Sequence, residues 1–244
     1  MRNLFILYIF LLTYSFQGNA QTSHAQESWW DYLNQNRYSE KWGSWLDLQL
    51  KLIDGFTHAK NVGEYTAGAS YFAKSNLKYT AAFTYVDGYP NNAHINHIAE
   101  LRPWAMVQLN TNNASSKWIQ WLRVEERFRE SVQNKLPTGE YDPSTRLRYY
   151  VLAQFPLNSK HKFEKGSLSF VTSEELYLNF GKNIVYNTFD QNRFFLGFYY
   201  YINNSNILQL GYTNLYQKFN VPNRYLQSDV LRISVFNNID FRTR

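Results

Sequence analysis

IQWLRVEERFR, residues 119–129, is the most informative segment of the chain. Successive side chains of a β-strand point to opposite faces, so this segment divides into two rows. The apolar row carries Leu122, Val124 and Phe128. The charged row carries Arg123, Glu125, Arg127 and Arg129. A row this densely charged and of mixed sign is unusual for the solvent face of a soluble sheet. If the apolar row instead faces lipid and the charged row lines a polar lumen, the pattern predicts a membrane β-barrel.

Other segments repeat this inverted pattern. Residues 42–53 alternate four leucines with Trp45, Asp47, Gln49 and Lys51. We therefore expect the side chains in the apolar row of each strand to face lipid. Eight of these side chains are Leu46, Leu48, Leu122, Val124, Leu147, Val151, Phe194 and Leu196. A soluble, lipocalin-like barrel is the structural alternative, and it would bury the leucines and expose the charges.

The N-terminus has the three parts of a secretory signal. Arg2 supplies a positive charge, residues 4–16 are apolar, and Gly18-Asn19-Ala20 forms a small-residue cleavage site. The apolar run is shorter than the roughly 20 residues that a spanning helix needs. We expect a signal peptide over residues 1–20 and one outer-membrane barrel domain over residues 21–244.

Composition excludes several classes of function. The chain has no cysteine, which excludes disulfides, thiol catalysis and cysteine-ligated metals. Aromatic residues make up 18% of the chain, as suits strands and the aromatic girdles of membrane barrels. The net charge of +6 does not indicate nucleic-acid binding, because the basic residues alternate with acidic ones within strands.

The predicted fold is an all-β, antiparallel, up-and-down transmembrane barrel. Eleven segments read as strands: residues 29–37, 42–53, 62–73, 77–87, 94–109, 118–131, 145–155, 166–180, 190–202, 206–219 and 229–241. Bacterial single-chain barrels have even strand numbers, so we expect ten spanning strands with 29–37 as an N-terminal segment, or twelve with one unrecognised. Residues 133–142 read as the longest loop, and Pro103 predicts a bulge or kink.

The order of several short motifs resembles a known bacterial family. These motifs are Trp42-Gly43, Glu100-Leu101-Arg102-Pro103-Trp104, Arg123-Val124-Glu125-Glu126-Arg127-Phe128, Arg146-Leu147-Arg148-Tyr149, Phe155-Pro156-Leu157, Glu175, Phe189-Asp190-Gln191-Asn192-Arg193 and Gly211-Tyr212. Together they cover nearly the whole mature chain, and they resemble the domain-of-unknown-function family 2490 (DUF2490). The resemblance implies an outer-membrane barrel without an assigned activity, and Pro103 departs from the family's pattern.

The candidate site is a set of charged residues on the predicted inward row. Its members are Glu100, Arg102, Arg123, Glu125, Arg127, Arg146, Arg148, Glu175 and Arg193. Guanidinium groups suit carboxylates and phosphates, so one interpretation is a binding site for an anion. The other, which we favour, is that these charges pair with each other and fill a narrow lumen.

Catalytic and metal chemistry have weaker support. A lipid hydrolase or acyltransferase would need a serine and a histidine within hydrogen-bond reach. His97 has the outward parity that such a site requires, but the chain has no Gly-x-Ser-x-Gly motif. His94 and His97 lie three apart in a strand and so point to opposite faces, which disfavours a metal site.

We therefore predict a non-enzymatic outer-membrane barrel of a Gram-negative-type bacterium, with a structural, interaction or envelope-maintenance role. No cofactor and no metal are expected. The expected partners are outer-membrane lipid and, during biogenesis, the barrel assembly machinery, whose recognition signal the final strand resembles. The alternatives are an outer-membrane lipid hydrolase or acyltransferase and a narrow pore for small anions.

Overall fold

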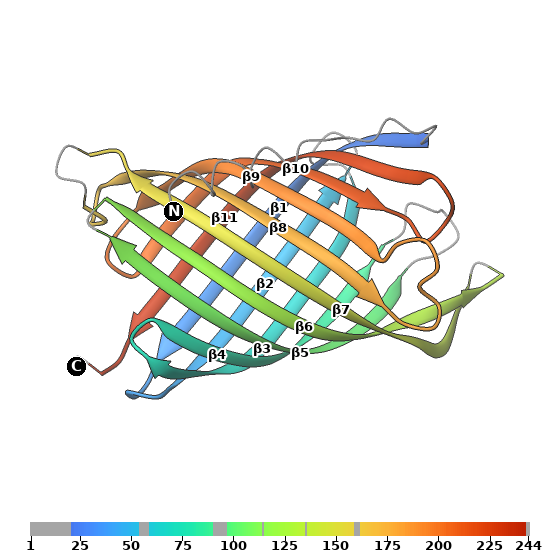
Figure 1. Ribbon diagram of the computed structural model, residues 1–244, viewed down its shortest axis with the longest axis horizontal. Coiled ribbons are helices and arrows are strands. Elements are labelled where there is room, and N and C mark those ends of the chain that lie inside the picture. The colour runs from blue at the N-terminus through green and yellow to red at the C-terminus, as the bar shows by residue number, and fades with distance from the viewer. Residues whose placement is uncertain are drawn as a thin grey trace, which may run out of the picture.

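The computed structural model describes residues 21–53, 59–89, 97–113, 115–134, 136–158 and 162–242, and the predicted signal peptide lies outside them. Eleven strands make up the described part: β1 (Gln21–Arg37), β2 (Trp42–Ile53), β3 (Ala59–Lys74), β4 (Leu77–Gly88), β5 (Ile98–Asn113), β6 (Ser116–Gln133), β7 (Leu136–Pro156), β8 (Leu168–Phe180), β9 (Phe189–Tyr201), β10 (Asn206–Lys218) and β11 (Arg224–Asp240). They form one closed barrel in which sequence neighbours pair antiparallel, and the strands run obliquely to its long axis (Figure 1). The all-β barrel prediction is confirmed.

The predicted count of ten or twelve strands is wrong, because β1 is a complete strand of the wall. It pairs with β11 in parallel along its whole length, from Gln21↔Arg224 to Arg37↔Asp240. With an odd number of up-and-down strands, the first and last run in the same direction, so closure requires one parallel ladder. Parallel pairing is only slightly less stable per residue than antiparallel pairing, so an odd barrel can close.

One local prediction fails, and at a second position the expected bulge is absent although the ladder is interrupted. The expected loop at residues 133–142 is a two-stranded hairpin, because β6 continues to Gln133 and β7 begins at Leu136. Near Pro103 we find no register shift. The β5–β6 ladder omits Arg102 and Pro103 and then resumes in the same register, with Leu101↔Phe128 before the gap and Trp104↔Glu125 after it. Proline lacks the amide hydrogen that would donate to β6, and this explains the interruption.

The two ends of the barrel are distinguished by the strand directions. We call the end at which β1 and β11 begin the N-terminal rim, and the end at which they finish the C-terminal rim. At the C-terminal rim β1 connects to β2, β3 to β4, β5 to β6, β7 to β8 and β9 to β10. At the N-terminal rim β2 connects to β3, β4 to β5, β6 to β7, β8 to β9 and β10 to β11.

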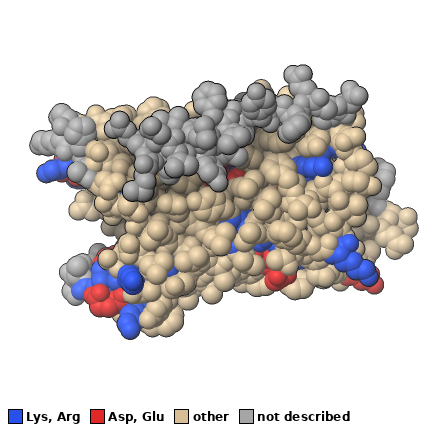
Figure 2. Space-filling model, in the orientation of Figure 1, with Lys and Arg blue, Asp and Glu red and all other residues tan. Residues whose placement is uncertain are grey.

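The inverted distribution of side chains is present in the structure. On the outer wall Leu122 and Val124 are 42% and 45% exposed. The residues that alternate with them face inward: Arg123 lines the lumen, and Glu125 is completely buried. Most charged groups on the visible face lie toward the two rims, and the wall between them is mainly uncharged (Figure 2). The arrangement expected of the alternative barrel, with buried leucines and exposed charges, is therefore not the one observed. Among the described residues we find no helix long and apolar enough to cross a membrane.

Large side chains occupy much of the barrel interior. One apolar cluster lies on the inner face of β7, β8 and β9 and is formed by Leu152, Val171, Phe195, Tyr199 and Tyr201. A second brings together Trp45, Trp104 and Met106 from β2 and β5. Charged and aromatic side chains therefore share the lumen.

The close packing of β9 and β10 yields a prediction. Gly197 lies opposite Gly211, and a Cβ atom at Gly197 would lie 2.5 Å from the Leu210 carbonyl oxygen and 2.5 Å from the Phe195 ring. We expect Gly197→Ala to lower the free energy of unfolding by about 1–3 kcal/mol, because the obstructing carbonyl belongs to the backbone. Denaturant unfolding measures it.

Gly63→Ala is the matched control. An added Cβ there meets only the exposed Tyr65 side chain, which can move aside. Equal losses of stability in the two variants would show that β9 and β10 are not packed as closely as described.

Candidate functional site: a charge network in the lumen

Glu125 of β6 is the centre of the charged interior. Its Oε2 atom accepts hydrogen bonds from Arg146 Nε at 2.9 Å and Nη2 at 2.6 Å, and its Oε1 atom accepts one from Arg148 Nη1 at 2.7 Å. The β6–β7 register places Arg146 directly opposite Glu125 and Arg148 opposite Arg123. Strand alternation and register together thus bring two guanidinium groups to one carboxylate.

Two further arginines lie near the same carboxylate. Arg123 Nη1 is 3.5 Å from Glu125 Oε1, and Arg102 Nε is 3.9 Å from Oε2. Arg102 connects Glu125 to a second carboxylate, because its Nη2 atom is 2.7 Å from Glu100 Oε1. Arg127 also binds Glu100, through Nε at 2.7 Å and Nη2 at 2.9 Å, which is the two-point geometry that guanidinium and carboxylate groups favour.

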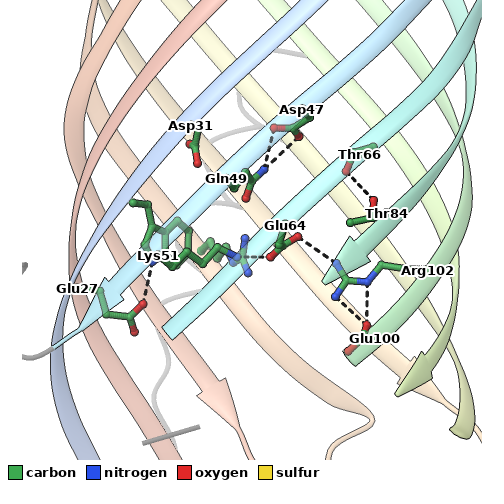
Figure 3. Close-up of polar contacts among 12 residues, drawn as sticks. Glu27, Asp31, Asp47, Gln49, Lys51, Glu64, Thr66, Thr84, Glu100 and Arg102 are labelled. Atoms are coloured by element: carbon green, nitrogen blue, oxygen red, sulfur yellow. Dashed lines mark hydrogen bonds and ion pairs between the residues drawn. The ribbon is translucent and has the colours of Figure 1, made fainter. Parts of the chain in front are cut away.

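The network continues toward β2 and β3. Arg102 Nη1 donates to Glu64 Oε2 at 3.2 Å, and Lys51 pairs with the other oxygen of Glu64. Figure 3 shows Lys51, Glu64, Arg102 and Glu100 following one another across the inner wall. On the other side, Arg148 binds Glu175 of β8 through Nε at 2.8 Å, and Arg146 Nη1 lies 3.3 Å from Asp190 of β9.

We call the connected set the lumen network. It consists of Lys51, Glu64, Glu100, Arg102, Arg123, Glu125, Arg127, Arg146, Arg148, Glu175 and Asp190. Eight of the nine predicted site residues are in it. Because each of its buried charges has a partner, the network meets the condition under which charges persist in a protein interior.

Arg193, the ninth predicted residue, is not joined by an ion pair among the described residues. Its guanidinium carbon lies 4.7 Å from the Trp29 ring centre and 4.6 Å from the Tyr177 ring centre, and Nε donates to Gln191. Lys51 lies over the same Trp29 ring at 4.8 Å. Trp29 thus links β2 and β9, which β1, β11 and β10 separate along the wall.

The sequence prediction missed Lys51, Glu64 and Asp190, and also a buried pair at the closing seam. Asp31 Oδ2 accepts from Arg232 Nε at 2.8 Å and from the Ser234 hydroxyl at 2.8 Å, joining β1 to β11. Lys51 and Glu64 have the inward parity, and this signal was available from the sequence. Asp31 gave no usable signal, because its partner lies across a closure that the sequence does not reveal.

A cavity of about 740 Å³ lies within the lumen. Among the described residues, eleven lysines and arginines line it, against five aspartates and glutamates. The excess of basic groups makes the cavity favourable for anions. We find no group of three or more histidine, aspartate or glutamate side chains that could hold a metal among the residues described.

The fold and the interior define a closed β-barrel with an apolar outer wall and a paired, charged lumen. A family model described as a protein of unknown function (DUF2490) matches residues 26–226, so the chain belongs to that family. No curated protein and no solved structure matches the chain.

Proposed function

We propose that this protein is a non-enzymatic β-barrel of a Gram-negative-type outer membrane, with a structural, interaction or envelope-maintenance role. The observation that carries the proposal is the side-chain distribution on β6, where leucine and valine are exposed outside a fully buried Glu125. Lipid solvates an apolar wall, and a closed barrel leaves no unpaired strand edge within the hydrocarbon. Export of the chain would depend on the signal peptide predicted at residues 1–20.

The same proposal names the partners. Outer-membrane lipid contacts the apolar wall, and the barrel assembly machinery inserts the chain. The alternating outer residues of β11, Leu231, Ile233 and Val235, support this second partner. Four of the five connections between strands at the C-terminal rim have four residues or fewer, which favours the periplasmic side for that rim.

Membrane fractionation with surface labelling tests the location. In a Gram-negative host, the protein is expected in the outer-membrane fraction, with a cysteine introduced at exposed Glu140 labelled on intact cells. Recovery in the soluble periplasmic fraction would contradict the proposal. A cysteine introduced at Lys41, in the β1–β2 turn of the opposite rim, is the control and requires a permeabilised outer membrane for labelling.

The arrangement of the lumen favours a barrel that does not conduct ions over a pore. The network spans β2 to β9, and both Lys51 of β2 and Arg193 of β9 lie over the ring of Trp29. Side chains of this size fill the interior of small barrels. In planar bilayers we expect the purified protein to show no steady single-channel conductance. A stable, anion-selective conductance would instead support the alternative of a narrow anion pore.

The hydrolase alternative rests on one pair at the N-terminal rim. His97 Nδ1 lies 2.5 Å from Asp87 Oδ1, which is the geometry of a histidine held by an acid. No serine or threonine hydroxyl contacts His97 among the described residues, and His94 lies outside them. A histidine–acid pair without a nucleophile does not perform acyl transfer.

We therefore predict no hydrolysis of phospholipid or of lipid A acyl chains by the purified protein. Mass spectrometry of lipids incubated with the detergent-folded barrel measures this. The unfolded protein is the blank. Turnover that disappears in His97→Ala would overturn the prediction and assign the rim pair a catalytic role.

A further inference from the structure

The lumen on the side of the C-terminal rim contains basic groups that lack acidic partners. Lys78 of β4 is 5% exposed, and its ammonium group donates to Gln35 Oε1 at 2.6 Å. Lys117 of β6 lies 4.1 Å from the Phe163 ring centre. Among the described residues, neither lysine forms an ion pair with a carboxylate. The two lysines therefore differ from the members of the lumen network, whose charges are paired.

Two buried donor atoms of other cavity-lining side chains also lack an acceptor, and one of them belongs to Arg123, whose Nη1 atom pairs with Glu125 in the lumen network. The Nε1 atom of Trp45 and the Nε atom of Arg123 have no hydrogen-bond partner among the described residues, and Trp45 is only 7% exposed. Both side chains line the lumen cavity, as does Lys78. Buried donors of this kind are rare in folded proteins and favour the binding of an acceptor.

These donors belong to one contiguous cluster. Lys78 Nζ is 4.8 Å from the Trp45 ring centre, and Trp45 meets Trp104 edge to face with ring centres 6.0 Å apart. Arg123 Cζ lies 4.0 Å from the Trp104 ring centre. We call Trp45, Lys78, Trp104 and Arg123 the donor cluster, and it is supplied by four strands, β2, β4, β5 and β6.

The wall across the cavity has a different character. Leu152, Phe195, Tyr199 and Tyr201 line the cavity from β7 and β9, which lie on the other side of the barrel from β2 and β4. Trp121 and Tyr150 stack with ring centres 4.9 Å apart and line it as well. An occupant that satisfies both walls needs an anionic acceptor at one end and an apolar body at the other.

We propose that the donor cluster binds the carboxylate of a small organic acid whose apolar body lies against the β7–β9 wall. The Lys78 ammonium supplies the opposite charge, and the carboxylate oxygens accept hydrogen bonds from Trp45 Nε1 and Arg123 Nε after these two buried side chains turn toward the cavity. An ammonium has three donors, and only one hydrogen bond of the Lys78 side chain is accounted for by Gln35. An inorganic oxyanion would satisfy the donors but leave the apolar wall unused.

The test is equilibrium binding to the full-length barrel folded in detergent micelles, measured by isothermal titration calorimetry with benzoate as the probe. Benzoate is expected to bind saturably and at least tenfold more tightly than acetate or inorganic phosphate. Empty micelles give the blank for partitioning. Because the assay needs neither a membrane nor a conductance, its result is independent of the function proposed above.

Three variants locate the site. Lys78→Gln is expected to weaken benzoate binding at least tenfold, and Trp45→Phe, which removes only the Nε1–H donor and part of the ring, at least threefold. Lys41→Gln, in the exposed β1–β2 turn of the same rim, should bind as the parent does.

The outcomes that overturn the proposal are equally specific. They are an absence of saturable benzoate binding, equal affinity for acetate or phosphate, or unchanged binding in Lys78→Gln. If Lys78→Gln does not fold, Trp45→Phe decides alone, and parental affinity in that variant would exclude the donor cluster as the site.

Discussion

Glu125→Ala is expected to lower the free energy of unfolding of the detergent-folded barrel by about 3–5 kcal/mol, because it leaves buried guanidinium groups uncompensated. Arg146 and Arg148 keep second partners in Asp190 and Glu175. Arg123 does not, because Glu125 is the only described carboxylate within ion-pair distance of it. The loss should therefore fall at the high end for a single substitution. Denaturant unfolding, followed by loss of heat-modifiable gel mobility, measures it.

A double-mutant cycle separates pairing from burial. Glu125→Gln with Arg146→Gln should cost less than the sum of the two single changes, by about 0.5–3 kcal/mol, because the two side chains bind each other directly. Glu140→Ala, at an exposed position of the β6–β7 hairpin, is the control and should be nearly silent. Additive doubles, with Glu125→Ala no worse than Glu140→Ala, would show that the network is solvated. The alternative of a narrow anion pore would then replace the proposal of a non-conducting barrel.

The alternation of residues in single strands was sufficient to predict the two faces of the wall. Strand geometry places Arg123, Glu125 and Arg127 on one face and Leu122 and Val124 on the other once the strand is recognised. The dense row of mixed charges then favoured the charged face as the inner one. The pairing of Glu125 with Arg146 needs one more piece of information, the β6–β7 register. Because β6 and β7 are consecutive antiparallel strands, they pair with each other and only a few registers are possible. The ion pairs between these two strands were therefore predictable.

The closure of the barrel was not predictable in the same way. Residues 21–26 of β1 have no alternation of apolar and polar side chains, and their partner strand lies about two hundred residues away. Nothing local distinguishes such a segment from a loop. The Asp31–Arg232 pair depends on this closure, and so it could not be inferred before the strand count was known.

The β6–β7 hairpin shows a second limit. Pro137, Gly139 and Pro143 are turn residues by composition, yet they lie within β7. The hairpin contains a register shift between Glu130 and Val132, and most of its described side chains beyond that point are exposed. A ladder that is exposed on both faces tolerates proline and glycine, so composition alone misidentified it as a loop.

Contacts across the lumen depend on the diameter and stagger of the closed barrel, and these are properties of the whole strand set. Arg193 illustrates this. Its inward parity was predictable, but its guanidinium group lies over the Trp29 and Tyr177 rings and, among the described residues, forms no ion pair with Glu175, which lies opposite it in the ladder. The donor cluster has the same origin, because Lys78 of β4 reaches Gln35 of β1 over the intervening strands.

Leu122→Arg is the second change with a large expected effect. Leu122 lies on the outer wall, and its register neighbours Val107 and Tyr149 also face outward. If this wall meets lipid, an arginine near mid-membrane should reduce the free energy of folding into lipid vesicles by about 2–4 kcal/mol. Denaturant titration of the vesicle-inserted barrel, read by tryptophan fluorescence, measures the change.

Leu136→Arg is the matched control, since it makes the same substitution at a position in the β6–β7 hairpin that is 64% exposed. Near the membrane interface or beyond it, the same arginine should cost about 0–1 kcal/mol. The difference between the two variants therefore reports the depth of Leu122 in lipid and not the general cost of introducing arginine. Equal effects would mean that water bathes the outer wall at Leu122. In that case the outer-membrane proposal would fail.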